Sequence, residues 1–261
     1  MHNYYHGIDI GSSFTKIVVI DGTGLVCYRN VTKTLNRNKE ELSGILDEIN
    51  SRFSPSGVCA TGYGREHFKG AHLNKTEIFC ASVGVSSLYP VRKNILDIGG
   101  EDIKVLLSEA DGKVDGFYMN TKCAAGTGTF ITEIAERAEI DVKHMSELAA
   151  QSDFKQELNS FCTVFAKTEI MRWIFDEVPV PDLARGIYIS IANRITKIRM
   201  EKDLPVFLIG GVIEHHPYLR IILEEKLGQQ VIVPEFPQLT NALGAALLAK
   251  KHEGKYTVIN T

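Results

Sequence analysis

The feature that most limits the possible folds is a pattern that occurs twice in the chain. One short apolar strand leads into Asp9-Ile10-Gly11, and another leads into Asp97-Ile98-Gly99. After each turn two further strands follow, and then segments with the apolar spacing of a helix. Two halves that open in the same way predict an internal duplication, in which each half is an α/β unit with helices packed on a sheet.

The other elements are expected from apolar spacing, glycine turns and proline breaks. In the first half we expect strands at 5–10, 15–20, 25–31 and 58–61, and helices at 40–53 and 80–88. In the second half we expect strands at 94–98, 103–107, 114–119, 206–209 and 231–233, and helices at 128–138, 144–151, 163–175, 183–201, 216–227 and 238–251. The change of pattern at Tyr89-Pro90 divides the chain into a first subdomain, 1–89, a second subdomain, 90–240, and a C-terminal helix in 241–261.

The composition is that of a folded globular protein. The 261 residues are 44% hydrophobic and 23% charged, which suffices for sizeable cores. The formal net charge of −3 gives no basic footprint, so we expect no nucleic-acid partner. No apolar run is long enough to span a bilayer and no charged-then-apolar leader opens the chain, so we expect no membrane partner. Five cysteines without regular spacing favour a reducing compartment, and the expected location is cytoplasmic.

Three glycine turns follow apolar strands, and their chemistry suits phosphate. They are Gly11-Ser12-Ser13 with Thr15 and Lys16 behind it, Gly99-Gly100, and Gly210-Gly211. Such turns let backbone N–H groups approach phosphate oxygens, and the Asp ahead of the first two can hold a hydrated Mg²⁺. None of the turns has the spacing of a Walker A loop or of the dinucleotide fingerprint. A single strand–glycine turn is common in α/β proteins and is weak evidence by itself. The two strand–Asp-x-Gly turns at the start of two similar halves are much stronger evidence for phosphate binding.

Two of the five cysteines stand at the start of a helical segment. Cys123 lies just ahead of the small-residue turn Gly126-Thr127-Gly128, and Cys162 opens the helical run 163–175. A helix N-terminus favours a thiolate, so both are candidate metal ligands. Two thiolates are half of the four that an iron–sulfur cluster normally needs. The alternative is that both are small buried apolar residues, which is our interpretation of Cys27, Cys59 and Cys80.

Other polar groups are assigned no chemistry from their pattern. The basic stretch with Arg194, Lys197, Arg199 and Lys202 is expected to be a solvated face on which an acidic partner could dock. His215-His216, at an expected helix start, is interpreted as capping or surface rather than as a metal site. Glu101, beside the second turn, is either a general base or an exposed turn carboxylate.

Several of these segments together resemble a known family. Asp-Ile-Gly-Ser-Ser-x-Thr-Lys from Asp9, Asp-Ile-Gly-Gly from Asp97 and Ile-Gly-Gly-Val from Ile209 look like the phosphate and adenosine motifs of the actin, Hsp70 and sugar-kinase superfamily. More narrowly, the stretches 96–104 and 119–128, with Lys-Cys-Ala-Ala-Gly-Thr-Gly, resemble the BadF/BcrA-type ATPases. Within these, the chain is similar over essentially its whole length to the activators of 2-hydroxyacyl-CoA dehydratases.

The resemblance implies a duplicated, ribonuclease H-like α/β fold whose two domains surround a nucleotide cleft. It implies a homodimer with one [4Fe–4S] cluster between the subunits, held by Cys123 and Cys162 of each. It also implies ATP or ADP with Mg²⁺, with Asp9 and Asp97 organising the metal ion. The residues implied to lie against nucleotide are Gly11, Ser12, Ser13, Thr15, Lys16, Gly99, Gly100, Gly126, Thr127, Gly128, Gly210 and Gly211.

The same resemblance predicts the function. ATP binding or hydrolysis would drive a low-potential electron, received from a donor such as ferredoxin or flavodoxin, into an iron–sulfur dehydratase. Two positions depart from the family pattern. Glu101 stands where many activators have Gln, and Lys167 replaces an expected acidic residue beside Cys162. The second difference could indicate another partner, such as a double-cubane-cluster reductase.

Three other interpretations stay open. A small-molecule kinase of the same superfamily would need a substrate pocket with a catalytic Asp, and it has no use for paired cysteines at helix starts. A nucleotide-dependent assembly or sensor protein would contain no iron. The ATPase subunit of a benzoyl-CoA reductase would share the motifs but would co-purify with other subunits.

Overall fold

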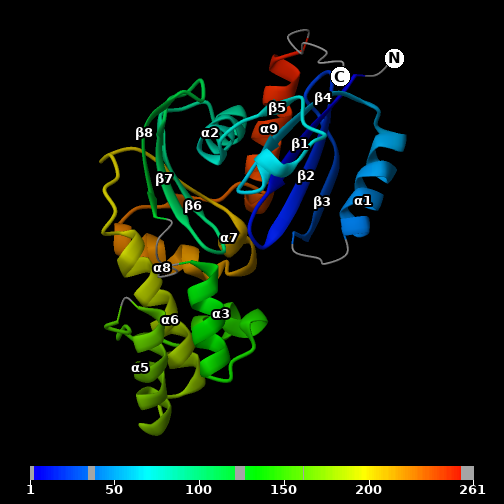
Figure 1. Cartoon of the computed structure of the whole chain (residues 1–261). Helices are drawn as coiled ribbons and strands as arrows, with labels where there is room; N and C mark the ends of the chain where they lie inside the picture. The colour runs from blue at the N-terminus through cyan, green and yellow to red at the C-terminus, as the bar shows by residue number, and fades with distance from the viewer. Residues whose placement is uncertain (1–2, 35–38, 121–126, 161, 254–261) are drawn as a thin grey trace. The chain divides into compact units, whose positions relative to one another are not determined.

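The computed structural model describes residues 3–34, 39–120, 127–160 and 162–253. The chain forms two compact units (Figure 1). The first contains Met1–Val91, Ser108–Asp115 and Leu239–Thr261, and the second contains Arg92–Leu107 and Gly116–Gln238. The helix set apart by sequence as 241–261 thus belongs to the same unit as the first strands. Within the described residues, no helix has the length and apolar character needed to cross a membrane.

The first unit is built on a five-stranded sheet of order β3-β2-β1-β4-β5. Its strands are β1 (Tyr4–Ile10), β2 (Phe14–Asp21), β3 (Val26–Lys33), β4 (Pro55–Thr61) and β5 (Leu73–Asn74). The first three are antiparallel neighbours, whereas β4 runs parallel to β1 and to β5. The edge strand β3 alternates half-buried and exposed residues, whereas the central strand β1 is buried from Tyr5 to Ile10.

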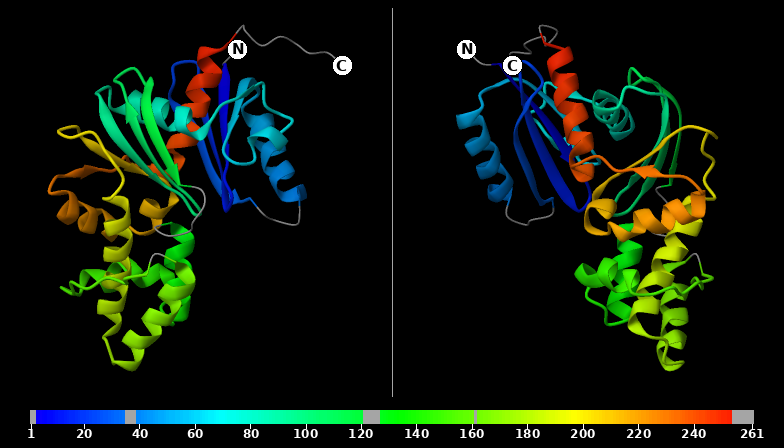
Figure 2. Two further views of the ribbon diagram at one scale, coloured as in Figure 1. Left: turned by 60° about the vertical axis from the view of Figure 1, so that its left-hand side comes forward. Right: turned by 180° about the vertical axis from the view of Figure 1, so that it is seen from behind.

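Helices cover both faces of this sheet. Helix α1 (Lys39–Arg52) packs Ile49 against Ile8 and Ile17 on one face. Gly7, which points to the other face, meets α9 (Thr240–Lys251) so closely that a Cβ there would lie 1.9 Å from the carbonyl oxygen of Ala242. Helix α2 (Glu77–Leu88) packs along α9. The right-hand view of Figure 2 shows α1 and α9 on opposite sides of the sheet.

The second unit repeats the sheet and adds helices. Its strand order is β10-β9-β6-β7-β8. Taken from the other edge, as β8-β7-β6-β9-β10, this order matches that of the first sheet strand for strand. The strands are β6 (Lys93–Ile98), β7 (Ile103–Ser108), β8 (Val114–Asn120), β9 (Val206–Ile209) and β10 (Val231–Ile232). The sequence-based expectation of an internal duplication is therefore confirmed.

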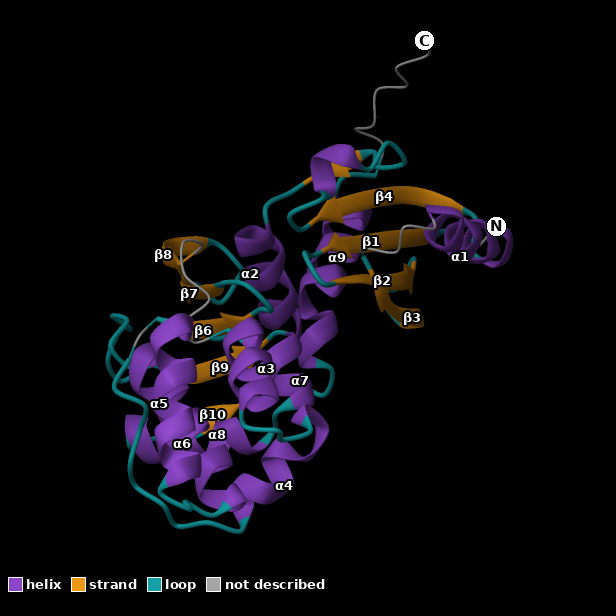
Figure 3. Cartoon of the chain, turned by 60° about the horizontal axis from the view of Figure 1, so that its bottom comes forward, coloured by secondary structure: helices purple, strands orange, loops and turns teal. Residues whose placement is uncertain are grey.

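The helices of the second unit share one hydrophobic core with its sheet. They are α3 (Gly128–Arg137), α4 (Met145–Ala150), α5 (Thr163–Phe175), α6 (Val180–Ile195), α7 (Gly211–His215) and α8 (Tyr218–Leu227). Helix α6 is buried along most of its length and packs against α3, α4 and α8 (Figure 3). Short 3₁₀ turns at Arg65–His67, Val142–His144 and Pro237–Leu239 complete the structure.

Two helix predictions were wrong in their bounds. The helix expected at 183–201 is α6, which ends at Ile195; beyond it the loop is held by Asn94, whose side chain donates to Glu201 O at 2.8 Å and accepts from Glu201 N at 3.0 Å. The helix expected at 216–227 is α8, which begins at Tyr218, and the short helix α7 that precedes it was not predicted. The break between α7 and α8 falls at His216, whose φ of −129° and ψ of 62° lie outside the α region, which the following Pro217 disfavours.

The cysteine interpretation needs one correction. Cys59 and Cys80 are completely buried, as expected. The pKa of the Cys80 thiol is raised well above its usual value by its interaction with Cys59 and by burial, so it stays protonated. Cys27, by contrast, is exposed rather than part of the core. It lies on β3, an edge strand with alternating exposure, and occupies one of the outward positions.

Candidate functional site

The first candidate turn connects β1 to β2. Asp9 is the last residue but one of β1 and is 2% exposed, with Lys16 of β2 opposite it. Lys16 Nζ lies 3.1 Å from Asp9 Oδ2, and Gly11 N donates to Phe14 O at 3.1 Å, which closes the turn. Asp9 Oδ1 is buried without a hydrogen-bond partner among the described residues. A buried carboxylate oxygen left in this state fits a site for a hydrated cation.

The second candidate turn connects β6 to β7 in the same way, but its lysine pairs mainly with a different carboxylate. Asp97 is 3% exposed, and Lys104 stands at the same offset from it as Lys16 from Asp9. Lys104 Nζ lies 2.7 and 2.8 Å from the two carboxylate oxygens of Asp102, and 4.0 Å from Asp97 Oδ2. Gly99 N donates to Asp102 O at 2.9 Å. The lysine is therefore held mainly by Asp102.

In each unit a glycine with positive φ supports the turn from the neighbouring parallel strand. Gly62 follows β4 with φ 90°, and Gly210 follows β9 with φ 103°. A Cβ on Gly62 would lie 2.4 Å from Ile10 O and 2.6 Å from Asp9 Oδ1; on Gly210 the distances are 2.3 Å to Ile98 O and 2.7 Å to Asp97 Oδ1. Both the backbone angle and the close approach therefore require glycine.

The third turn, Gly210-Gly211, leads into α7 and is followed by a buried histidine. Gly210 N donates to Pro237 O at 3.1 Å. His216, which the sequence placed as capping or surface, is 6% exposed at the C-terminal end of α7. Its Nδ1 lies 2.8 Å from the hydroxyl of Tyr188 on α6. Burial, and to a lesser degree the neighbouring His215, lower the pKa of His216 to about 4.

The second turn is joined directly to the start of α3. Gly128 N donates to Gly99 O at 3.1 Å, and Thr129 donates to Gly100 O through its N at 2.8 Å and its Oγ1 at 2.7 Å. The carbonyl groups of the turn therefore fix the first residues of α3. The same bonds occupy the N–H groups of Gly128 and Thr129, so these two N–H groups are not free donors at this helix start.

Cys162 is exposed at the N-cap of α5, the position at which the sequence predicted it. It is tied to Ser160 by two hydrogen bonds, because Cys162 N donates to Ser160 Oγ at 3.3 Å and Ser160 Oγ donates to Cys162 O at 3.2 Å. An exposed thiol at the start of a 13-residue helix fits the ligand of a metal cluster. Cys123 and Gly126 lie outside the described residues.

The segment before Cys162 is held by side chains from two helices. From α5, the carboxylate of Glu169 accepts from Asn159 N at 2.9 Å and from Ser160 N at 3.1 Å. From α6, Ser190 Oγ accepts from Leu158 N at 2.7 Å. Arg194, also on α6, donates to Ser160 O. The backbone just before Cys162 is therefore held to α5 and α6 by hydrogen bonds.

Arg194 corrects the expectation of a solvated basic face. It is 9% exposed, whereas Lys197, Arg199 and Lys202 are exposed as predicted. The guanidinium carbon of Arg194 lies 4.1 Å from the centre of the Phe130 ring on α3, which is a cation–π arrangement. This burial could not be predicted from local sequence, because Phe130 and Ser160 are far from Arg194 along the chain.

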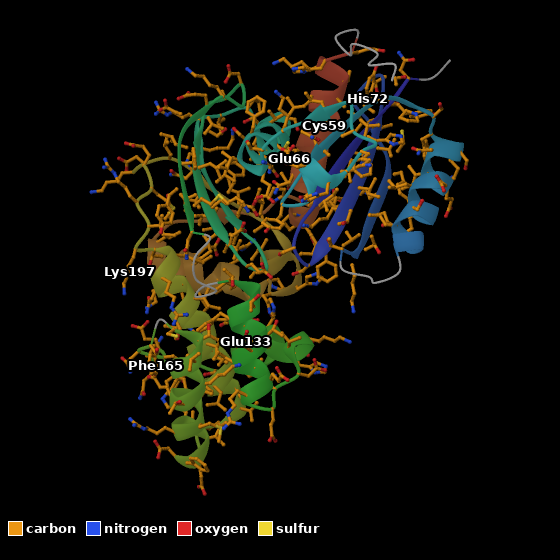
Figure 4. All side chains as sticks on the ribbon, viewed as in Figure 1. Cys59, Glu66, His72, Glu133, Phe165 and Lys197 are labelled. Atoms are coloured by element: carbon orange, nitrogen blue, oxygen red, sulfur yellow. The ribbon has the colours of Figure 1, made fainter. Side chains whose placement is uncertain are left out.

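Two exposed apolar side chains follow Cys162 on α5, and an ion pair further along this helix joins it to α3. Val164 and Phe165 are 69% and 68% exposed. Lys167 Nζ lies 2.7 Å from a carboxylate oxygen of Glu133 and links α5 to α3, each side chain being 39% exposed. Figure 4 shows Phe165 on α5 and Glu133 on α3.

Two further placements complete the site. Glu101 is exposed in the second turn. Within the described ranges, no group of three or more His, Cys, Asp or Glu side chains lies close enough together to hold a metal ion. The sequence analysis missed Lys104 and Gly62. The repeated Asp-to-Lys offset could have identified the first, and the strand–glycine step at Thr61-Gly62, which resembles Ile209-Gly210, the second.

Comparison with known proteins identifies the family. The pattern of the BadF/BadG/BcrA/BcrD ATPase family matches residues 6–249. The chain belongs to this family. It is 35% identical over 254 residues to the 2-hydroxyisocaproyl-CoA dehydratase activator of Clostridioides difficile, covering 94% of each protein. Membership in an ATPase family carries ATP binding and hydrolysis as the general activity.

Solved structures agree with this assignment. Component A of the (R)-2-hydroxyglutaryl-CoA dehydratase of Acidaminococcus fermentans superposes with a TM-score of 0.89 at 31% identity, over 96% of this chain and 99% of the other. The 2-hydroxyisocaproyl-CoA dehydratase activator of Clostridium difficile with bound ADPNP gives 0.86 at 30% identity, over 98% and 96%. A glucokinase of the ROK family from Streptomyces griseus gives 0.57 at 13% identity over 95% of this chain and 100% of that chain, which shows the shared fold alone. The predicted actin- and sugar-kinase-like fold class is confirmed.

Proposed function

We propose that this BadF/BadG/BcrA/BcrD-family protein is an ATP-driven electron-transfer activator that delivers low-potential electrons to an iron–sulfur partner enzyme. The observation that carries the proposal is the position of Cys162, an exposed thiol at a helix start whose supporting segment is bonded to α5 and α6. The full-length similarity to a dehydratase activator supports it. A small-molecule kinase offers no reason for this arrangement.

The nucleotide would be bound by the glycine turns. We assign Mg²⁺, through water, to Asp9 and Asp97, because both carboxylates are buried at strand ends and Asp9 Oδ1 has no hydrogen-bond partner in the described structure. Lys16 and the backbone at Gly11-Ser12-Ser13 and Gly99-Gly100 would neutralise and cradle the phosphates. Gly210-Gly211 would lie against adenosine. Glu101, exposed in its turn, is the candidate general base for the attacking water.

The cluster would lie between two copies of the chain. Cys123 and Cys162 supply two thiolates, and a [4Fe–4S] cluster takes four, so a twofold dimer completes the set. The exposed Val164 and Phe165 beside Cys162 suit a surface that a second copy covers. When bound, the cluster supplies a one-electron carrier; the chain's own part is to hold Cys162 on a fixed backbone and to exclude water with these apolar side chains.

The partner would be an iron–sulfur dehydratase or a double-cubane-cluster reductase, with ferredoxin or flavodoxin as the electron donor. The similar proteins are activators of 2-hydroxyacyl-CoA dehydratases, which supports the first choice. Lys167 stands where an acidic residue was expected, and this sequence difference is the ground for keeping the reductase as the second choice; its ammonium group is paired with Glu133.

The test is anaerobic purification followed by measurement of iron, acid-labile sulfide and the EPR spectrum after reduction by dithionite. We expect about four irons per dimer, lost in Cys123→Ser and in Cys162→Ser. Cys27→Ser is the matched control, since Cys27 is also exposed but lies on an edge strand. Iron-free wild type that still hydrolyses ATP would reject the proposal and favour the kinase.

A further inference from the structure

We propose that Arg194 is a positioning residue that joins α3 to the Cys162 segment and so completes a path from the second phosphate turn to the thiol. The inference rests on the proposed function for the identity of the ligand at that turn, a nucleoside triphosphate with Mg²⁺. It goes beyond that function by assigning a residue that touches neither nucleotide nor cluster. All the groups concerned belong to the second unit.

The first step of the path is the pair of turn carbonyls. Gly99 O and Gly100 O accept three hydrogen bonds from Gly128 and Thr129, with distances of 3.1, 2.8 and 2.7 Å. A phosphate that draws the N–H groups of this turn toward itself rotates the peptide groups to which these carbonyls belong. The first turn of α3 must follow such a rotation or lose hydrogen bonds.

The second step is the contact of Arg194 with α3. Phe130, the residue after Thr129, is fully buried, and its ring lies 4.1 Å from the Arg194 guanidinium carbon. A buried cation is costly unless it keeps its hydrogen bonds and contacts. The guanidinium is therefore held where it contacts the Phe130 ring and Ser160 O. Its planar shape makes the contact with the ring directional, which a lysine ammonium would not reproduce.

The third step is the hydrogen bond from Arg194 to Ser160 O. Ser160 is bonded in turn to both the N–H and the carbonyl group of Cys162. Ser190 and Asn193 lie on the same face of α6 as Arg194. Ser190 Oγ accepts from Leu158 N at 2.7 Å. Asn193 Nδ2 donates to the Glu157 carboxylate at 2.6 Å. The segment 157–160 therefore moves with α6, and Arg194 is the member of this set that also contacts α3.

The test measures whether nucleotide changes the reactivity of the Cys162 thiol. In the full-length chain freed of iron, the rate of alkylation of Cys162 by iodoacetamide is followed by peptide mass mapping, with and without Mg²⁺ and ADPNP. In the wild type we expect ADPNP to change this rate by about fivefold or more, the lower end of ordinary coupling between sites. In Arg194→Gln we expect the ratio to fall to about one while ADPNP still binds.

Three further variants separate positioning from general damage. Arg194→Lys keeps the charge and should restore only part of the ratio, because the planar contact with Phe130 is lost. Phe130→Leu removes the ring from the other side of the contact and should reduce the ratio in the same way. Lys197→Gln is the matched control: it removes a positive charge from the same basic stretch at an exposed position, and its ratio should equal that of the wild type. Circular dichroism melting curves verify folding.

The outcomes distinguish this inference from the proposed function. A ratio that stays at the wild-type value in both Arg194→Gln and Phe130→Leu overturns the path, and so does a wild type whose Cys162 ignores ADPNP. If a variant changes the Cys162 alkylation rates with and without ADPNP by the same factor, their ratio is unchanged. That result assigns Arg194 a purely structural role and also overturns the proposed path. Because alkylation is measured without iron, none of these results depends on the cluster assay.

Discussion

The two halves of the chain share one sheet topology but put it to different uses. In the first half the turn after β1 pairs Lys16 directly with Asp9 at 3.1 Å. In the second half Lys104 is held by Asp102, and the carbonyls of the turn bind the start of α3. Among the described residues between the third and fourth strands, the first half has only α1, whereas the second half has α3 to α6. The helices that surround Cys162 are thus an insertion at one defined point of a duplicated framework.

This difference suits two tasks that the proposed ATP-driven activator would perform. The first turn, in which Lys16 pairs with Asp9, is suited to balancing charge at the end of a strand. A turn whose carbonyls hold a helix is suited to transmitting movement. In the proposed activator we expect the Asp9 turn to contribute most to binding the metal ion, and the second half to contribute most to coupling.

The largest expected effect concerns the two strand-end carboxylates. Asp9→Asn should lower kcat for ATP hydrolysis by about a hundredfold to a thousandfold, in the range found when a preorganised electrostatic group is removed. Asp97→Asn should lower it less, because Asp97 shares its surroundings with Lys104 and Asp102. Steady-state phosphate release under saturating Mg-ATP measures both. A larger loss in Asp97→Asn would make the second turn the main site for the metal ion.

The glycines with positive φ should respond equally in the two halves. Gly62→Ala and Gly210→Ala should each lower the free energy of unfolding by about 2.5 kcal/mol, since a left-handed Ala costs about 1–2 kcal/mol and the overlap with a carbonyl adds to this. Urea denaturation measures the change. Gly228→Ala is the control, because Gly228 has φ 67° but open space around it, and it should cost about 1 kcal/mol. Unequal losses at Gly62 and Gly210 would show that the two frameworks are not equivalent.

A pH effect should come from the buried imidazole after the third turn, in the second half. The pKa of His216 is lowered to about 4 by burial and by His215, against about 6.5 in an unfolded chain. Its contribution to stability is therefore complete above about pH 6.5 and is lost as the pH falls toward 4. Between pH 7 and pH 5 the wild type should lose about 2 kcal/mol from this group alone. His216→Gln should show a smaller pH dependence in urea denaturation, and the exposed His215→Gln should retain most of it.

The smallest effect is expected from the ion pair between α3 and α5. Lys167 and Glu133 are 2.7 Å apart but each is 39% exposed, so solvent screens them. A double-mutant cycle with Lys167→Gln and Glu133→Gln should give a coupling free energy of about 0.5 kcal/mol that decreases with added salt. A coupling of several kcal/mol would mean that this ion pair contributes much of the contact between α3 and α5.

The sequence predicted the framework because its signals are local. The strand–Asp-x-Gly turns and the position of Cys162 at the start of α5 follow from apolar spacing and turn chemistry within a few residues. The burial of Arg194 could not be predicted in this way, because Phe130 and Ser160 are brought to it only by the packing of α3 and α6. The same holds for His216, whose neighbour Tyr188 comes from another helix. The exposure of Cys27 depends on which strand forms the sheet edge, which apolar spacing alone does not determine.

The place of α9 in the first unit has a consequence for how the protein is made. Helix α9 packs on β1 and on α2, where Gly244 meets Cys80 so closely that a Cβ would lie 1.9 Å from its carbonyl oxygen. Between the end of α2 and the start of α9 the ribosome adds about 150 residues, which takes on the order of 10 s or more at about 5–20 residues per second. Throughout that time the nascent sheet has one apolar face uncovered, which is a surface that chaperones bind. The sheet whose strands are synthesised first therefore cannot be fully covered until α9 has been synthesised.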